Sequence, residues 1–331
     1  MNKFCKTFTS ALCLCILSAS SLSGIAAAAT PSSTSATGSG YRISPVRTDL
    51  TLNPGQTKVL TLFLTNVSPA PENLQITAND FQARDESGTP AILLNGASTP
   101  QHGLKQYLLV PSGTLNLKPG QQAGINVQVK LPANIVPGGY YGAVRFAPAS
   151  ISGTKSVNLA ASVASLILVR VAGPVHENLS VASFQVAQKG SARSFFTSNK
   201  NLQGVIRLLN NGDVQEEPFG KILLQKGKNT PGAYEVNNVN PRGNVLPGSI
   251  RRFTVNLDKV GSFGKYKLVG SIGYGTSGQV VNAETTFYVI PLALIITVVG
   301  VIVLIIFLIF VLPRLIRGYN QRVIRRAQRR R

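Results

Sequence analysis

The sequence lacks tryptophan, contains a single methionine and has only three cysteines among its 331 residues. The cysteines are Cys5, Cys13 and Cys15, so a chain that loses its first fifteen residues has no thiol. Such a chain has no disulfide bond and no cysteine-based metal site. A secreted protein without disulfides is more typical of bacteria than of an animal cell surface.

Charged residues are also scarce, at 14% of the chain, whereas glycine (31 residues) and proline (19 residues) are frequent. This composition predicts short strands and many turns rather than long soluble helices. The length allows about two domains in addition to targeting segments.

Acidic residues are absent after Glu284, and the stretch from residue 289 to 312 carries no charge at all. As a helix it would be roughly 36 Å long, enough to cross a hydrocarbon core of about 30 Å. An arginine-rich tail, residues 313–331, follows it, and arginines beside a span mark the cytoplasmic side. The tail contains Arg314, Arg317, Arg322, Arg325, Arg326, Arg329, Arg330 and Arg331. We therefore expect a single-pass type I protein of the plasma membrane, with an extracellular ectodomain and a short cytoplasmic tail.

Two other interpretations of this stretch are a buried core helix and a removable sorting signal. A core helix is seldom followed directly by an arginine tail, and a sortase signal needs an LPxTG-like motif that residues 283–287 do not supply. The tail itself either fixes the topology only or also lies on anionic lipid head groups as a short basic helix.

Residues 1–29 are typical of a signal peptide. Lys3 and Lys6 form a basic start, residues 8–22 are apolar, and the alanine run at 26–29 offers a cleavage site. An uncleaved anchor is the alternative, and a lipoprotein site is disfavoured because Leu14 precedes Cys15. Residues 30–40 form a Ser/Thr-rich linker.

The fold class that we predict is an all-β ectodomain of two tandem immunoglobulin-like β-sandwiches, followed by one C-terminal transmembrane α-helix. Apolar and polar residues alternate with period two in many short segments, and no segment keeps a 3.6-residue apolar period. We assign residues 41–173 to the first sandwich and residues 174–288 to the second. Predicted strands are 57–65, 124–131, 142–146, 163–171, 204–209, 220–225, 252–257, 266–273 and 280–288.

A Pro-Gly pair occurs three times just before an alternating segment, at Pro54-Gly55, Pro119-Gly120 and Pro247-Gly248. Proline fixes φ near −65° and glycine accepts a positive φ, as the two central positions of a type II turn require. The recurrence indicates that both domains are variants of one immunoglobulin-like plan.

The net charge is +21, which raises the possibility of a nucleic-acid-binding protein. The basic residues of the ectodomain are scattered, however, and no basic-aromatic platform is present. A basic ectodomain fits an anionic envelope of lipid head groups or wall polymers better than nucleic acid.

The sequence offers no catalytic set, and we expect neither an enzyme nor a cofactor. Its two histidines, His102 and His176, stand alone, which disfavours a zinc site, and no serine occurs in G-x-S-x-G. Asp80, Asp85 and Glu86 could suggest paired carboxylates, but residues 85–88 are better explained as a hairpin turn, and Glu216-Glu217 is interpreted in the same way.

The best candidates for ligand contact are Tyr140, Tyr141 and Arg145. Adjacent strand residues face opposite ways, so one tyrosine should pack inward and the other point outward. An exposed tyrosine could stack on a sugar ring, and Arg145 could pair with a carboxylate or phosphate. Alternatively, both rings complete the sandwich.

The segments Asn53-Pro54-Gly55-Gln56, Leu131-Pro132 and residues 137–146 (PGGYYGAVRF) resemble the peptidoglycan-binding domain of WxL-interacting proteins of Gram-positive bacteria. That family shares the layout of signal peptide, two immunoglobulin-like domains, one span and a basic tail. The resemblance implies that the first domain contacts peptidoglycan and that the second engages other surface proteins or host matrix.

Our leading hypothesis is a membrane-anchored bacterial surface protein whose ectodomain binds cell-wall glycan or another surface protein. The alternative is a membrane-tethered scaffold or chaperone-like accessory protein that offers a sheet edge to a partner strand. A third possibility is an accessory component of a sensor or transporter.

Overall fold

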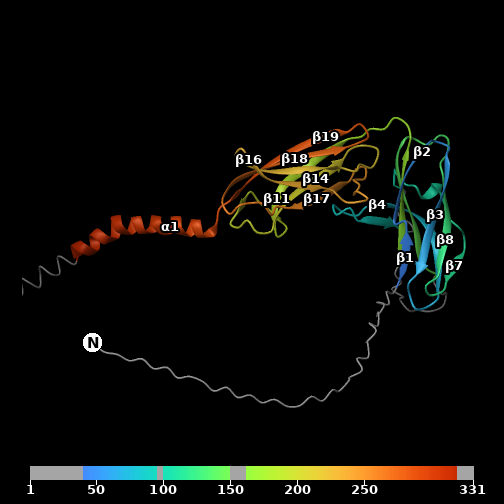
Figure 1. Cartoon of the computed structure of the whole chain (residues 1–331), viewed down its shortest axis with the longest axis horizontal. Helices are drawn as coiled ribbons and strands as arrows, with labels where there is room; N and C mark the ends of the chain where they lie inside the picture. The colour runs from blue at the N-terminus through green and yellow to red at the C-terminus, as the bar shows by residue number, and fades with distance from the viewer. Residues whose placement is uncertain (1–39, 95–99, 150–161, 319–331) are drawn as a thin grey trace, which may run out of the picture. The chain divides into compact units, whose positions relative to one another are not determined.

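A computed structural model of the chain describes residues 40–94, 100–149 and 162–318. The predicted signal peptide, nearly all of the linker and the six arginines from Arg322 onward lie outside these residues. The described chain is mostly β-strand and ends in one apolar helix (Figure 1).

The first pair of sheets uses residues 41–171 only. One sheet has the order β1-β3-β8-β6, and the other has the order β2-β10-β9-β4-β5, with β7 also paired to β4. The strands are β1 (Tyr41–Ser44), β2 (Arg47–Leu52), β3 (Thr57–Asn66), β4 (Glu72–Ala83), β5 (Pro90–Leu93), β6 (Leu108–Leu109), β7 (Thr114–Leu117), β8 (Gln122–Lys130), β9 (Gly138–Pro148) and β10 (Val163–Val171), with a 3₁₀ turn η1 (Lys105–Tyr107).

The second pair of sheets uses residues 179–289 only, with the orders β12-β11-β14-β17 and β13-β19-β18-β15-β16. The strands are β11 (Leu179–Gln188), β12 (Ser191–Ala192), β13 (Phe195–Phe196), β14 (Leu202–Asn210), β15 (Phe219–Lys226), β16 (Asn229–Val236), β17 (Ile250–Asn256), β18 (Gly264–Tyr274) and β19 (Gln279–Val289). No strand is shared with the first pair, so the predicted boundary at 173/174 falls between two separate sheet pairs.

Each pair of sheets encloses its own apolar core. The first core is built from side chains between Leu52 and Val171, and the second from side chains between Leu179 and Val289. Alternation along the strands places these side chains inside and polar ones outside, as in β3, where Leu62 and Leu64 are fully buried and Phe63 is exposed.

The three Pro-Gly turns have the predicted backbone. Gly55, Gly120 and Gly248 all have positive φ, at 79°, 73° and 69°. In each turn the N–H that follows the glycine donates to the carbonyl three residues back, at 3.0–3.1 Å. The glycines are therefore required by the backbone of the turn.

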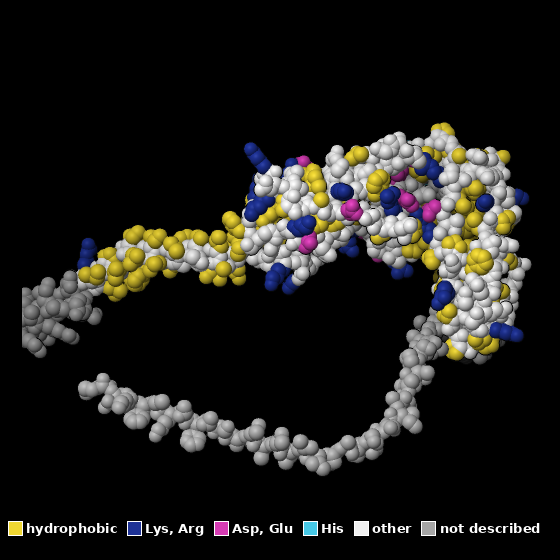
Figure 2. All heavy atoms as spheres, viewed as in Figure 1, with side chains coloured by type: hydrophobic (Ala, Val, Ile, Leu, Met, Phe, Trp, Pro, Cys, Tyr) yellow, Lys and Arg dark blue, Asp and Glu magenta, His cyan; other side chains and the backbone are white. Residues whose placement is uncertain are grey.

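The apolar helix runs from Leu292 to Gly318, including α1 (Leu292–Ile306) and a π-helical segment η2 (Phe307–Val311). Hydrophobic side chains cover its surface (Figure 2), and its apolar side chains are exposed. Its length and composition are those of a single-pass membrane anchor. The predicted start at residue 289 was wrong by three residues, because Val289 is the fully buried last residue of β19.

Candidate functional site

Tyr140 and Tyr141 point to opposite faces of β9, as the sequence predicted. Tyr140 faces the first core and is half-buried; its hydroxyl donates to the carbonyl of Val136 at 3.0 Å. Its ring packs edge-on against Tyr107 at a centroid distance of 6.1 Å. One ring therefore completes the sandwich.

Tyr141 lies on the outward face of β9 but is only 3% exposed, because the second sandwich covers it. Its hydroxyl donates to Gln215 Oε1 at 3.0 Å, and Leu246 of the second sandwich packs against the same cluster. Burial raises the pKa of the phenol well above its usual range. The ring offers no face to a sugar in this structure, as in the alternative interpretation in which both rings complete the packing.

Arg145 is half-buried and approaches Ser162 Oγ at 3.3 Å through Nε. It lies four residues along the strand from the covered Tyr141. The three candidate residues therefore do not form one exposed surface, and a sugar contact at Tyr140 and Arg145 stays a prediction.

A polar joint connects the two sandwiches around Arg47, which begins β2. Arg47 Nη1 donates to the carbonyl of Arg242 at 2.6 Å, Nη2 pairs with Glu217, and Nε pairs with Asp49 at 2.7 Å. Asn244 Oδ1 accepts a further bond at 3.1 Å. One arginine of the first sandwich thus holds three groups of the second sandwich, a role that no local sequence pattern indicated.

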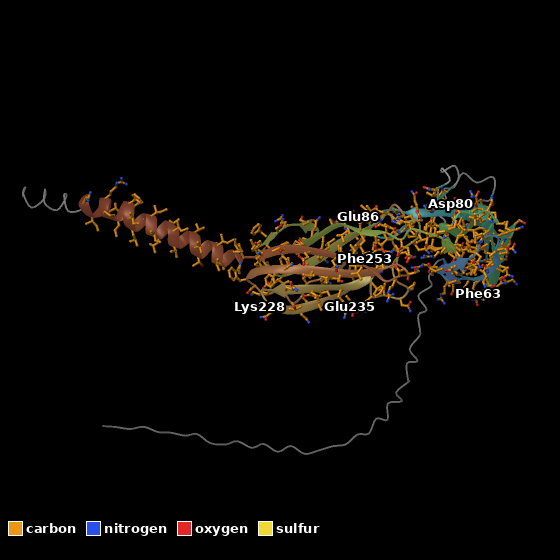
Figure 3. The ribbon with its side chains drawn as sticks, turned by 90° about the horizontal axis from the view of Figure 1, so that it is seen from above. Phe63, Asp80, Glu86, Lys228, Glu235 and Phe253 are labelled. Atoms are coloured by element: carbon orange, nitrogen blue, oxygen red, sulfur yellow. The ribbon has the colours of Figure 1, made fainter. Side chains whose placement is uncertain are left out.

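A second link joins the β4–β5 hairpin to the edge of β17. Residues 85–88 form the predicted turn, in which Ser87 N–H donates to Asp85 Oδ1 at 2.7 Å. Glu86 of this turn also contacts the second sandwich. Its carboxylate pairs with Arg207 at 2.7 Å and its carbonyl accepts the N–H of Arg252 at 2.7 Å. Figure 3 labels Glu86 of the first sandwich and Phe253 of the second, the residue that follows Arg252 in β17.

Glu216 is buried in the joint, contrary to its interpretation as a turn residue; it is 2% exposed. Burial, followed by the nearby charge of Glu177, raises its pKa to about 7, although Oε2 accepts the N–H of Gly275 at 2.9 Å. Its Oε1 has no hydrogen-bond partner among the described residues. Burial works against Glu177 too, yet its bonds to Arg170 (2.6 Å) and Thr276 hold its pKa below the usual range.

Several pockets open at the joint, and one of about 300 Å³ is lined by Phe81 and Tyr141 of the first sandwich and Leu246 of the second. A pocket of about 80 Å³ is lined by side chains that include Arg47, Phe81 and Leu168. A larger one of about 340 Å³ is lined by Asp49 and Glu216 among others. Across residues 40–94, 100–149 and 162–318 no three histidine or carboxylate residues cluster as metal ligands, and His102 bonds to the carbonyl of Gly139 at 2.8 Å. The joint is a packed polar contact between the two sandwiches.

The second sandwich has a long open strand edge along β19. β18 pairs with all eleven residues of β19 on one side, whereas β13 pairs only with Tyr288 and Val289 on the other. Tyr288 N–H and Ile290 N–H donate to this outer side, to Ser194 and Phe196. By the alternation of an antiparallel ladder, the N–H groups of residues 280, 282, 284 and 286 also point outward. β11, which belongs to the other sheet, lies close to β19, but the two strands are not hydrogen-bonded to each other as a ladder.

No protein family model matches the sequence, and no curated protein matches it. Among solved structures, the chain is similar to a chaperone–tip adhesin complex of CFA/I fimbriae biogenesis (14% identity, 76% of this chain, 99% of that chain, TM-score 0.36). It is also similar to the class 5 fimbriae chaperone CfaA (15%, 76% and 100%, 0.35) and to the E. coli chaperone DraB (14%, 75% and 96%, 0.32). At these identities and TM-scores we transfer no function from them.

Proposed function

We propose that this chain is a membrane-tethered scaffold or chaperone-like accessory protein whose ectodomain accepts an extended segment of a partner protein outside the membrane. One observation carries the proposal: the outer edge of β19 between residues 279 and 287 has no paired strand among the described residues. An open edge presents unpaired N–H and C=O groups and is a template for an added strand.

The chain itself supports this use of the edge. β13 already pairs in parallel with the last two residues of β19, and the Phe196 side chain is buried in the second core. Along the rest of the edge, Val281 and Ala283 are only partly buried and pack against that core. An incoming strand with alternating apolar side chains would cover them as Phe196 covers the end of the core.

The edge also lacks the usual protection against strand addition. β19 contains no proline and no bulge in its register with β18, and its one charged side chain, Glu284, is paired with Lys267 at 2.6 Å. By contrast, the edge strand β16 contains Pro231 and a register shift. β19 is therefore better suited than β16 to accept a partner.

Photo-crosslinking in intact cells tests the proposal. A photoreactive residue in place of Asn282, which is exposed on β19, is expected to give one dominant protein adduct, and the same residue in place of Lys221 on β15 is expected to give none. Thr286→Pro removes an outward N–H without breaking a bond to β18, and it should abolish the adduct. Equal adducts from both positions, or none, would overturn the proposal.

Binding to cell-wall glycan is the second candidate, favoured by the basic ectodomain and by the resemblance of residues 137–146 to WxL-interacting proteins. It stays a prediction, as do the extracellular orientation and the contact of the arginine tail with anionic lipid. A pull-down of the full chain on purified peptidoglycan at low salt tests it, and lack of retention would remove this candidate while leaving the β19 proposal standing.

A further inference from the structure

The second sandwich passes into the membrane anchor almost without a linker. β19 ends at Val289 and α1 begins at Leu292, so only Ile290 and Pro291 lie between strand and helix. Ile290 is itself tied to the fold, since its N–H donates to the carbonyl of Phe196 at 2.8 Å. Whatever lies at this end of the sandwich is therefore held within a few residues of the membrane surface.

The strand registers show which segments share that end, called here the anchor end. Gly264 of β18 pairs with Val289, and Phe195 of β13 pairs with Tyr288. Lys226 Nζ donates to the carbonyl of Phe263 at 2.9 Å, which brings the β15–β16 turn to the same place. The anchor end therefore consists of residues 189–201, 226–229 and 258–265 together with the end of β19.

Large aromatic side chains are exposed at the anchor end. Phe195 is 63% exposed and stacks on Tyr288 at a centroid distance of 5.0 Å, and Phe263, which directly precedes β18, is 53% exposed. Exposed phenylalanines are unfavourable in water. At the head-group level of a bilayer, aromatic rings are favoured.

Basic side chains surround these rings. All of them are exposed, and several Lys and Arg side chains gather where the sandwich meets α1 (Figure 2). Lys228 is labelled at this end in Figure 3. They are Lys189, Arg193, Lys200, Lys226, Lys228, Lys259 and Lys265. Asp258 is the one acidic residue within the same segments.

The opposite end of the same sandwich is less basic. Glu177, Asp213, Glu216 and Glu217 lie there, in the joint with the first sandwich, together with Arg242 and Arg251. The acidic side chains therefore gather at the joint, whereas the anchor end carries seven cations and one acid. This asymmetry complements a negatively charged surface on the membrane side only.

We propose that the anchor end is a lipid-binding surface, in which Phe195 and Phe263 enter the interface and the seven basic side chains bind anionic phospholipid head groups of the leaflet that α1 enters. This inference depends on α1 as the anchor and not on the strand partner proposed for β19. Such binding holds the second sandwich against the membrane surface, in addition to its connection to α1 through the chain.

The absence of tryptophan allows a clean test. The full chain is placed in nanodiscs that contain brominated lipids, with a single tryptophan introduced by Phe263→Trp or Phe195→Trp. We expect the tryptophan emission to be at least halved relative to unbrominated discs. Phe219→Trp is the matched control, because Phe219 is 47% exposed but lies at the other end of the same sheet, where it pairs with Gly273. Equal quenching of all three reporters would overturn the proposal, and so would a lack of quenching at Phe195 and Phe263.

Head-group recognition is tested separately in discs of phosphatidylcholine with or without phosphatidylglycerol. Quenching at Phe263→Trp should rise with phosphatidylglycerol. Lys226→Gln, Lys228→Gln and Lys265→Gln in one chain should return it to the value in phosphatidylcholine alone. The control removes the same charge from the first sandwich by Lys58→Gln, Lys118→Gln and Lys130→Gln. Quenching that is independent of phosphatidylglycerol, or equal loss in both triple variants, would overturn the recognition of anionic lipid.

Discussion

Asn66 and Asn210 occupy equivalent positions in the two sandwiches and make the same five hydrogen bonds. Each is fully buried at the end of a strand, β3 or β14. Each side-chain amide donates to the carbonyl four residues ahead, Ala70 or Val214, and to a carbonyl just before a Pro-Gly turn, Leu117 or Val245. Each Oδ1 accepts the N–H two residues ahead. Each backbone unit bonds to the turn glycine, Gly120 or Gly248, and to the residue after it.

This repeated device supports the interpretation that the two domains share one plan. In both sandwiches it ties the end of one strand to the turn that opens another. The sequence pointed to it only through the recurring Pro-Gly pair, because the two asparagines lie far from the turns that they hold.

Replacing either asparagine should destabilise its own sandwich. Asn66→Ala and Asn210→Ala each remove three side-chain hydrogen bonds, and at roughly 1 kcal/mol per bond we expect a loss of about 3 kcal/mol in the free energy of unfolding. Urea unfolding of the full chain in detergent measures it. Asn116→Ala is the control, since Asn116 is exposed and bonds only to Asn73. A change below that of the control would show that the two networks do not stabilise the fold.

Substitution of the turn glycines tests the backbone conformation of the turns alone. A Cβ at Gly120 or Gly248 would meet no atom within 4 Å, so Gly120→Ala and Gly248→Ala test only the positive φ. We expect each to lower stability by about 1 kcal/mol. Gly270→Ala, at ordinary φ with Cβ contacts of 3.6 Å and beyond, should be neutral or stabilising. Thermal unfolding in which all three variants behave alike would contradict the turn assignment.

The buried carboxyl of Glu216 makes the joint sensitive to pH. Its pKa rises from 4.5 to about 7 on folding, so the folded state binds more protons than the unfolded state between these two values. Stability should therefore fall as the pH rises from about 4.5 to about 7 and then level off. Glu216→Gln should remove this fall, and at pH 8 it should raise the free energy of unfolding by about 3 kcal/mol.

Unfolding midpoints across the pH range measure this effect. The neighbouring Glu177, whose pKa is lowered, gives the opposite slope near and below its usual pKa, so the comparison is made at and above pH 5. Glu235→Gln, at an exposed carboxylate on β16, serves as the control and should leave the slope unchanged. A wild-type slope that survives in Glu216→Gln would assign the pH dependence to another group.

Arg47 should determine how firmly the two sandwiches are joined. Arg47→Ala leaves Asp49 and Glu217 without their common partner. The N–H of Gly139 donates to the backbone carbonyl of Asp213 in the second sandwich at 2.8 Å, and we expect this N–H to exchange about tenfold faster in the variant. Hydrogen exchange of the full chain measures it. Arg42→Ala, at an exposed arginine on β1, is the control. Unchanged exchange at Gly139 would mean that other contacts suffice to hold the joint.

Much of the fold followed from local patterns. β10 was predicted with its observed ends, and the three turns were predicted with their positive φ. The predicted strands 204–209, 220–225 and 266–273 are each shorter than the observed strands by only one or two residues at each end. In these segments one face is buried and the other exposed, so the period of two is visible in the sequence.

Two long strands that were missed, β11 and β4, have a broken alternation. In β11 the register with β14 shifts between Val181 and Ser183, so the pattern changes face within the strand. In β4, Asn79 and Asp80 are buried polar residues next to the apolar Phe81, because hydrogen bonds satisfy them. Local hydrophobicity does not indicate either case.

The joint could not be predicted, because its contacts join residues that are distant in sequence. Tyr141 meets Gln215, and Glu86 meets Arg207. The exposure of the outward ring, Tyr141, depends on where the second sandwich packs. The sequence near Tyr141 does not indicate that position.

The direct passage from β19 into α1 has a mechanical consequence. Tension between the membrane and anything that the ectodomain holds enters the fold at Val289 and runs along β19. That strand is joined to β18 at eleven consecutive positions, from Val289 opposite Gly264 to Gln279 opposite Tyr274. A pull along the strand loads these bonds together in shear instead of peeling them one after another, so the second sandwich can bear load between the anchor helix and whatever the two sandwiches bind.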